Sequence, residues 1–237
     1  MERSKCICHM FVSIDGKIIG NYMESEAAAG AGSFYEDYID QVAPKAWGCG
    51  RVTYEVNYEA AQGKPIDLQP FLKEKTPAGD FVVPAKGSYA VCFDRFGKIN
   101  WTGNTIEYPE GKPALILEVL TEKSRPGYLN FLRSLGIPYI IAGKEDLDPK
   151  LFLEKLKKEF GVETFALCGG GNINSAFIGK NLVDEISLVM VASVDGASHG
   201  LSFCESSDGV GFPRDYHLLE AKPLGNDVVW LRYAKKE

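Results

Sequence analysis

Three consecutive glycines, Gly169, Gly170 and Gly171, separate an apolar segment from a stretch of helical length. Because glycine lacks a Cβ atom, its backbone adopts positive φ angles and approaches a ligand closely. A helix that begins after such a turn presents free N–H groups and the positive end of its dipole, which favour an anion. The pattern therefore predicts a strand–turn–helix unit that binds phosphate, and it leaves open a tight structural turn without a ligand.

A second segment of the same kind contains Gly50, Arg51 and Thr53, within Trp47-Gly48-Cys49-Gly50-Arg51-Val52-Thr53-Tyr54-Glu55. Arg51 supplies a planar charged donor, and Thr53 supplies a hydroxyl in the first helical turn. Together the two segments predict that two helix N-termini hold one dinucleotide, and Arg51 favours the 2′-phosphate of NADP. The alternatives are a solvated cation for Arg51 and an ordinary N-terminal cap for Thr53.

With these motifs in this order, the chain resembles the dihydrofolate-reductase-like superfamily, and within it the pyrimidine reductase domain of riboflavin biosynthesis. That resemblance implies one domain over residues 1–237, with a loop-rich insertion near residues 57–87. It also implies a three-layer α/β fold with a central mixed, mostly parallel sheet and a C-terminal antiparallel hairpin. The segments that carry the resemblance are Val12-Ser13-Ile14-Asp15-Gly16-Lys17-Ile18, Gly50-Arg51-Val52-Thr53, Cys168-Gly169-Gly170-Gly171 and Leu182-Val183-Asp184-Glu185.

The composition agrees with an α/β enzyme that binds a small molecule. The 237 residues, 45% of them hydrophobic, suffice for a full core. A net charge of −6 argues against a broad nucleic-acid surface. Asp15 and Lys17 interrupt the first apolar stretch, so we expect neither a signal peptide nor a membrane span, and a cytoplasmic location.

The cysteines predict no metal site. The six cysteines are dispersed and lie mostly in apolar stretches, which favours reduced, buried thiols over a disulfide framework. In Cys6-Ile7-Cys8-His9, the two cysteines share one face of a strand and His9 lies on the other face. We therefore expect core packing for these residues and no bound metal.

Apolar runs of strand length alternate with segments of helical period, as in α/β layer folds. The turn sequence Leu224-Gly225-Asn226-Asp227 predicts the terminal hairpin, which joins residues 216–223 to residues 228–233. Further strands are expected at residues 6–13, 46–48, 89–94, 114–120, 139–142, 164–168 and 185–192, and helices at 33–42, 52–58, 127–135, 149–160 and 173–180.

The resemblance places the nicotinamide beside the end of the first strand and the loop after it. It thereby implies Asp15 as a catalytic group, Ser13 and Lys17 as substrate contacts, and Ile19 beside the cofactor. A hydride transfer needs the two reacting carbons held close, water excluded and a proton supplied. The alternatives are an ordinary turn for Asp15 and a solvated charge for Lys17.

Further positions follow from the same resemblance. Ser25, in a loop, and Cys168, before the glycines, are implied as substrate contacts. Riboflavin reductases usually carry a glutamate at the position of Cys168, and a thiol does not accept hydrogen bonds from sugar hydroxyls as a carboxylate does. Asp94 is expected to cap a turn, whereas Asp184 and Glu185 are expected to serve turn and solvation roles.

The sequence thus predicts an NADPH-dependent reductase of the riboflavin pyrimidine-reductase type. It would transfer hydride to a small heterocyclic or ribosylamino phosphate substrate and form a homodimer. The alternatives are a non-catalytic NADP-binding regulator, suggested by Cys168, and a reductase of a pterin or a xenobiotic. The expected cofactor-binding residues are Ile19, Gly50, Arg51, Thr53, Gly169, Gly170, Gly171 and Asn172.

Overall fold

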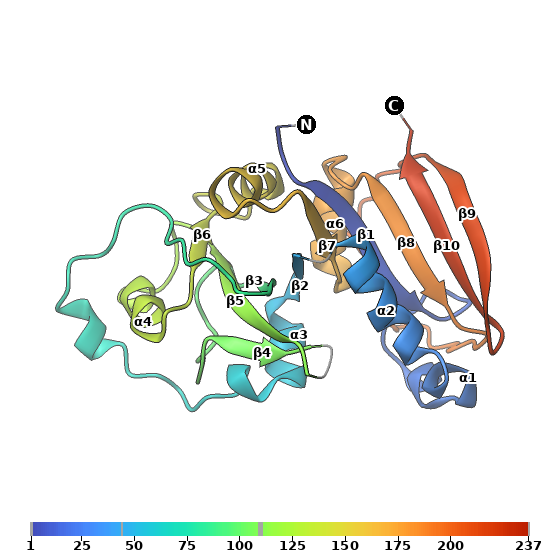
Figure 1. Ribbon diagram of the computed structural model, residues 1–237, viewed down its shortest axis with the longest axis horizontal. Coiled ribbons are helices and arrows are strands. Elements are labelled where there is room, and N and C mark those ends of the chain that lie inside the picture. Colours follow the sequence, from blue (N-terminus) through green and yellow to red (C-terminus); the bar gives the residue numbers. More distant parts are fainter. Residues whose placement is uncertain (1, 44, 109–110, 237) are drawn as a thin grey trace. The chain divides into compact units, whose positions relative to one another are not determined.

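The computed structural model describes residues 2–43, 45–108 and 111–236. The chain divides into two compact units, each built of strands and helices (Figure 1). Unit 1 comprises Met1–Ser4 and Lys45–Glu163, and unit 2 comprises Lys5–Pro44 and Thr164–Glu237. The single domain over residues 1–237 stays a prediction.

Unit 1 contains a mostly parallel sheet with the strand order β4-β5-β3-β2, and β6 also pairs with β5. All of these pairs are parallel except β4 with β5. Its strands are β2 (Ala46–Gly50), β3 (Ser88–Phe93), β4 (Thr105–Glu107), β5 (Pro113–Leu120) and β6 (Tyr139–Ile141). Its helices are α3 (Arg51–Asn57), η2 (Glu59–Ala61), η3 (Gln69–Leu72), α4 (Tyr128–Leu135) and α5 (Pro149–Phe160).

Helices cover both faces of the unit 1 sheet. Phe93 of β3 packs edge-on against Phe152 of α5, with ring centroids 5.0 Å apart. Cys92 is the preceding residue and therefore faces the other side of the sheet. There it is in register with Glu118 of β5, which accepts a hydrogen bond from the hydroxyl of Tyr128 in α4. Because side chains alternate between the two faces, the unit 1 sheet lies between α5 on one face and α4 on the other.

Unit 2 contains the strand order β7-β1-β8-β10-β9. The pairs β7–β1 and β1–β8 are parallel, and β10 runs antiparallel to both β8 and β9. Its strands are β1 (Lys5–Val12), β7 (Thr164–Leu167), β8 (Glu185–Met190), β9 (Tyr216–Gly225) and β10 (Val228–Lys235). Its helices are η1 (Asn21–Glu24), α1 (Glu26–Ala29), α2 (Gly32–Val42) and α6 (Gly171–Gly179).

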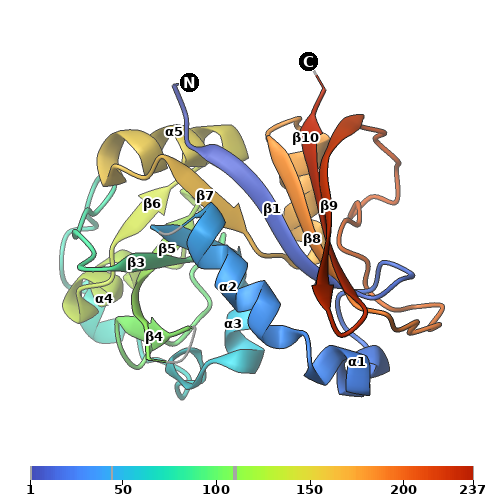
Figure 2. The same ribbon diagram turned by 45° about the vertical axis from the view of Figure 1, so that its right-hand side comes forward.

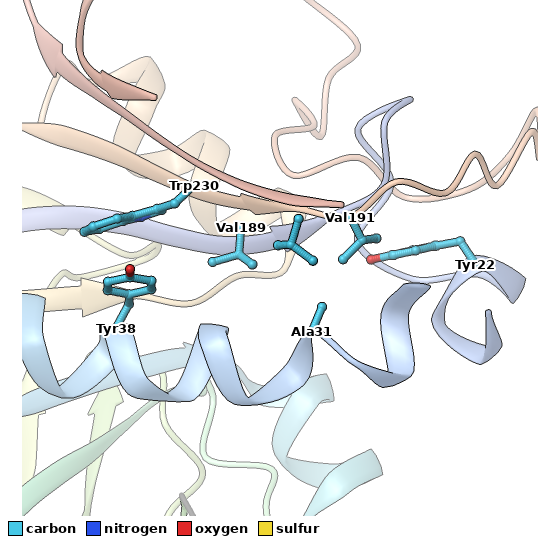
Figure 3. Packing of buried hydrophobic residues seen from close by; sticks show 7 residues of the cluster. Tyr22, Ala31, Tyr38, Val189, Val191 and Trp230 are labelled. Carbon is cyan, nitrogen blue, oxygen red and sulfur yellow. The ribbon is translucent and has the colours of Figure 1, made fainter. Parts of the chain in front are cut away.

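Helices α2 and α6 cover opposite faces of the unit 2 sheet. Figure 2 shows α2 running along one face of β1, where Tyr35 stacks on His9 with ring centroids 4.5 Å apart. Farther along α2, Tyr38 stacks on Trp230 of β10 at 3.7 Å (Figure 3). On the other face, Phe177 of α6 packs against Phe165 of β7. These aromatic contacts make the second three-layer arrangement.

The predicted strands and helices are all present, with ends that agree within two residues. The terminal hairpin is also confirmed, because Asn226 and Asp227 both have positive φ, at 51° and 57°, as its two-residue turn requires. The sequence did not predict β4, which has only three residues, or the short helices of residues 21–29. The loop expected around Ser25 is therefore wrong: Ser25 is the N-cap of α1, and its hydroxyl accepts a hydrogen bond from the Ala28 N–H.

Candidate nucleotide-binding turns and the loop after the first strand

The triple glycine lies between β7 and α6, as predicted. Gly170 is the N-cap residue of α6 and makes no side-chain cap, so the first N–H groups of the helix have no side-chain acceptor there. Gly169 has a φ of +92°, a conformation that favours glycine, and the adjoining Gly169–Gly170 peptide bond is cis. The strand–turn–helix unit is therefore present as predicted, and its binding of an anion stays a prediction.

The three glycines differ in what surrounds them. A Cβ atom on Gly171 would lie 2.5 Å from the backbone carbonyl oxygen of Ser202, so the chain's own packing requires glycine there. A Cβ atom on Gly170 would meet nothing nearer than the Cδ1 of Ile18, at 3.9 Å. This distance is an ordinary van der Waals contact, so the chain's own packing does not require glycine at position 170.

Asn174, in the first turn of α6, adds an unsatisfied polar atom beside the glycines. Its side chain is fully buried, and its Nδ2 donates to the carbonyl oxygen of Phe203 at 2.7 Å. Its Oδ1 is buried and accepts no hydrogen bond from the described residues. A bound water or ligand that donates to this atom would remove the cost of an unpaired buried acceptor.

The second predicted turn places Arg51 at the start of α3, directly after the N-cap residue Gly50. Because Gly50 occupies the N-cap position and Thr53 lies two residues into the helix, the alternative of Thr53 as an N-terminal cap is wrong. Arg51 Nη1 forms an ion pair with the carboxylate of Glu55, one turn later. Its Nε also lies 3.9 Å from Oδ1 of Asp94.

Asp94 caps a turn, which confirms its predicted role. The carboxylate is only 2% exposed, and its Oδ2 accepts hydrogen bonds from the backbone N–H groups of Lys98 and Ile99. Burial raises the pKa of this carboxyl group, while the N–H donors and Arg51 counteract the rise.

Glu118 is a buried acid beside Asp94 that sequence reasoning missed. Its carboxylate accepts hydrogen bonds from the indole of Trp101 at 3.0 Å and the hydroxyl of Tyr128 at 3.3 Å. Complete burial raises the pKa of Glu118 well above its ordinary value, and the charge of Asp94 raises it further. The available signal was a single acid inside the apolar run of residues 114–120.

The loop after β1 brings Ser13 and Asp15 together. The buried Ser13 hydroxyl donates to Asp15 Oδ1 at 2.6 Å, and Asp15 also accepts from the N–H groups of Asp195 and Gly196 at 3.1 and 3.0 Å. The Ser13 hydroxyl, followed by these backbone donors, lowers the pKa of Asp15 to about 2. An acid this strong stays ionised at neutral pH, so Asp15 suits orientation of a substrate better than proton donation.

The other predicted residues of this region have different settings. Lys17 donates from its backbone N–H to the Ser13 hydroxyl and from its ammonium group to the Gly200 carbonyl oxygen at 2.9 Å, so its predicted alternative as a purely solvated charge is wrong. Ile19 is an exposed apolar side chain, with 58% of its surface accessible. Cys168 is half-buried, and its thiol donates to the Ala166 carbonyl oxygen.

Glu185 corrects one expectation. Its predicted solvation role is wrong, because the side chain is 2% exposed and pairs with Lys5 at 2.9 Å and Arg232 at 2.7 Å. Asp184, just before β8, accepts a hydrogen bond from the Cys6 N–H of β1 at 2.8 Å, and its turn role stays a prediction.

The described residues show neither a metal-binding cluster nor a membrane-spanning helix. No group of three or more histidine, cysteine, aspartate or glutamate side chains in residues 2–43, 45–108 and 111–236 is arranged to hold a metal ion. Over the same ranges, no helix has both the length and the apolar character needed to cross a bilayer.

The chain is similar in fold to several solved reductase structures. It shares 17% identity and a TM-score of 0.66 with RibD of Acinetobacter baumannii, over 100% of this chain and 59% of that one. A pyrimidine reductase-like protein of Corynebacterium diphtheriae gives 14% identity and a TM-score of 0.69, over 99% and 92%. The riboflavin biosynthesis reductase of Saccharomyces cerevisiae gives 14% and 0.60, over 100% and 91%.

At these identities the likenesses show a shared fold, and they agree with the predicted α/β class. The chain spans only 59% of the length of the Acinetobacter protein. No curated protein matches the chain. A family model, the RibD C-terminal domain, matches residues 98–230, which is more than half of the sequence. The chain therefore belongs to the family of RibD C-terminal domains.

Proposed function

We propose that this chain is an NADPH-dependent reductase of the pyrimidine-reductase type, which transfers hydride to a small heterocyclic or ribosylamino phosphate. The observation that carries the proposal is the turn before α6. There the helix N-terminus has no side-chain cap, and Gly170 is the one of the three glycines at which an added Cβ atom would clash with nothing. Family membership and the names of the similar reductases support the same reaction class.

The bound cofactor would supply the hydride, and the chain would supply its binding groups. The N–H groups at the start of α6, from Gly171 and Asn172, would donate to the pyrophosphate oxygens. The guanidinium of Arg51 would bind the 2′-phosphate through charge-assisted hydrogen bonds. Gly169, Gly170, Gly50 and Thr53 would line the two turns, and the exposed Ile19 would cover an apolar face of the cofactor.

The substrate groups belong to the loop after β1 and its neighbours. Asp15, held ionised by its three donors, would accept hydrogen bonds from substrate hydroxyl or amino groups and so orient the acceptor carbon. Ser13, Lys17, Ser25 and Cys168 complete the proposed substrate contacts. We place the protein in the cytoplasm as a homodimer, and size-exclusion chromatography with light scattering tests the dimer.

One observation favours a second function. Cys168 stands where riboflavin reductases usually carry a glutamate, and its thiol donates to the carbonyl oxygen of Ala166 in β7. A chain that keeps the nucleotide turns and lacks that carboxylate would suit an NADP-binding regulator, or a reductase of a pterin or a xenobiotic.

Calorimetric titration with NADPH, and separately with NADH, tests the proposal. We expect binding that favours NADPH, and we expect Arg51→Ala to weaken NADPH by about ten- to a hundredfold while weakening NADH much less, because a charged hydrogen bond contributes about 1.5–3 kcal/mol. Binding of neither nucleotide would contradict the proposal. NADPH consumption over a panel of pyrimidine, pterin and carbonyl acceptors then separates the reductase from the regulator.

A further inference from the structure

Unit 1 contains a cavity of about 490 Å³ that none of the proposed cofactor or substrate residues lines. It lies at the carboxyl ends of β5 and β6, marked by Thr121 and Ile141. These two strands are parallel neighbours, so their carboxyl ends meet at one edge of the sheet, where α/β folds commonly bind ligands. Its volume is within the range of small-molecule sites.

The loop-rich segment that the sequence marks as an insertion forms one wall of this cavity, through Thr76, Pro77 and Gly79. The wall is fixed on both sides. Before it, the carbonyl oxygen of Phe71 accepts a hydrogen bond from the Asn130 side chain at 3.0 Å. After it, Asp80 accepts from the Ile141 N–H at 2.8 Å and from Lys155 at 3.0 Å. The insertion therefore builds a defined surface over β5 and β6.

The charged lining of the cavity is mainly basic, although the chain as a whole has a net charge of −6. Arg125, Lys144 and Lys155 line it, with Glu122 as the one acid among the lining residues. Lys155 is already paired with Asp80, whereas Lys144 has no ion-pair partner among the described residues.

Arg125 is the second cation with an unused donor. Its Nε donates to the Gly97 carbonyl oxygen, and its guanidinium lies over the ring of Tyr128. Its Nη2 is buried and has no acceptor in the described parts of the chain. A buried N–H group without an acceptor is destabilising, and an anion reached by a small rotation of the guanidinium would satisfy it.

The rest of the lining is apolar. Leu129 of α4, Ile141 of β6 and Leu151 of α5 contribute side chains from three different elements, and Pro77 and Pro126 add two rigid rings. The cavity thus combines cationic donors with an apolar surface, a combination that suits a ligand with one anionic group and an apolar body.

We propose that this cavity binds a small phosphate monoester with a flat apolar body. The phosphate would lie against Arg125 and Lys144, and the body against Leu129, Ile141 and Leu151. This site shares no residue with those assigned to NADPH, so we expect the two ligands to bind independently, and the proposal does not depend on the reductase function.

Phenyl phosphate is the probe, and calorimetry and ligand-detected NMR are the measurements. We expect saturable one-to-one binding by the wild-type chain, at least about tenfold tighter than phenol or inorganic phosphate, each of which offers half of the contacts. Addition of saturating NADPH should leave this binding unchanged. Absence of saturable binding at millimolar phenyl phosphate overturns the proposal.

Variants locate the probe. Lys144→Glu should weaken binding by about tenfold or more, because it replaces a charge-assisted donor with a repulsive carboxylate. Thr76→Trp should block the cavity at its insertion wall. The matched control is Lys158→Glu, which makes the same charge change at an exposed position of α5 outside the cavity.

A variant is compared with the wild type only if its thermal unfolding resembles that of the wild type. One folded cavity variant, Lys144→Glu or Thr76→Trp, is enough for the test. Equal binding by Lys144→Glu, Thr76→Trp and Lys158→Glu overturns the proposal. If NADPH displaces phenyl phosphate and the Lys144→Glu variant binds phenyl phosphate as the wild type does, the probe lies at the nucleotide site. That result would also overturn the proposal.

Discussion

The guanidinium of Arg51 pairs with the carboxylate of Glu55 across one turn of α3, at the helix start proposed to bind the cofactor 2′-phosphate. Asp94 lies 3.9 Å from the same guanidinium. A phosphate at this place must therefore compete with two carboxylates for one cation. Glu55, which is the more exposed of the two, reduces the preference for NADPH that an unpaired arginine would give.

Glu55→Gln should tighten NADPH binding by about two- to fivefold and leave NADH nearly unchanged, because an exposed ion pair contributes about 0.2–1 kcal/mol. Calorimetric titration of both nucleotides checks this. Glu59→Gln, an equal charge change at an exposed position of η2, serves as the control. If both variants change NADPH affinity equally, net charge rather than the ion pair is responsible.

The neighbouring glycines Gly170 and Gly171 should respond oppositely to alanine. Gly171→Ala forces a Cβ atom against the Ser202 carbonyl and should lower the free energy of unfolding by about 1–3 kcal/mol. Gly170→Ala adds a Cβ atom in ordinary contact with Ile18, at 3.9 Å, so stability should change little. NADPH affinity should fall, because the added Cβ atom obstructs a group that approaches the helix N-terminus.

Urea unfolding and calorimetry measure the two glycine effects. Gly32→Ala, at the first residue of α2 with nothing within 4 Å of the added Cβ, controls for helix propensity. If Gly170→Ala binds NADPH with full affinity, the cofactor does not approach the backbone of this residue closely.

Asp15→Asn should loosen the loop after β8. The substitution removes the charge from the acceptor of the Asp195 and Gly196 N–H groups, so both amides should exchange with solvent faster. Since the pKa of Asp15 is lowered to about 2, its contribution is complete at neutral pH and is lost only as pH falls toward 2.

Hydrogen exchange followed by NMR at neutral pH is the measurement for Asp15→Asn. Asp208→Asn is the control, because this carboxylate likewise accepts from one backbone N–H, that of Val210, in the same long loop. The control should affect Val210 and leave Asp195 unchanged. Unaltered exchange at Asp195 and Gly196 in Asp15→Asn would refute the anchoring role.

His9 should make the chain acid-sensitive. Burial lowers its pKa to about 4, although its hydrogen bond to the Tyr35 carbonyl and the charge of Glu185 act in the opposite direction. The folded state therefore binds the proton more weakly than the unfolded chain, whose histidine titrates near 6.5. The stability that depends on the neutral, buried His9 is complete above about pH 6.5, and it is lost as the pH falls from about 6.5 to 4.

Between pH 7 and pH 5 this histidine should lower the free energy of unfolding by about 2 kcal/mol. His9→Gln, whose amide can replace the contacts to Ser187 and Tyr35, should remove that part of the decline. Urea unfolding at pH 7 and pH 5 measures the decline in the free energy of unfolding for the wild type and for His9→Gln. An equally steep decline in the variant would assign the acid sensitivity to other groups.

Local patterns explain why the fold was predictable. The core strands form apolar runs of strand length, the longer helices carry a helical period, and the hairpin turn at Asn226 and Asp227 has a composition that suits positive φ. The strand β4, Thr105-Ile106-Glu107, contains a single apolar residue and so forms no apolar run, unlike β6 of equal length. Ser25 was read as part of a loop because a four-residue helix shows no period.

The surroundings of the candidate residues depend on contacts between distant parts of the chain, which no local pattern reveals. Arg51 and Glu55 are four residues apart, so their pairing was readable from the helix period. By contrast, the contact of Arg51 with Asp94, the burial of Glu118 and the closeness of Gly171 to Ser202 come from folding alone. The roles of the site residues remain predictions.

The pairing of β1 has a consequence for synthesis on the ribosome. Among the described strands, Lys5–Val12 precedes its two neighbours in the unit 2 sheet, Thr164–Leu167 and Glu185–Met190, by more than 150 residues. The nascent β1, which is apolar over most of its length, therefore remains unpaired while residues 45–163 of unit 1 are translated. An unpaired apolar strand can bind a chaperone or pair with a non-native segment. Slow translation after residue 163 prolongs this unpaired state, so it should lower the yield of native protein more than slow translation before β1 emerges.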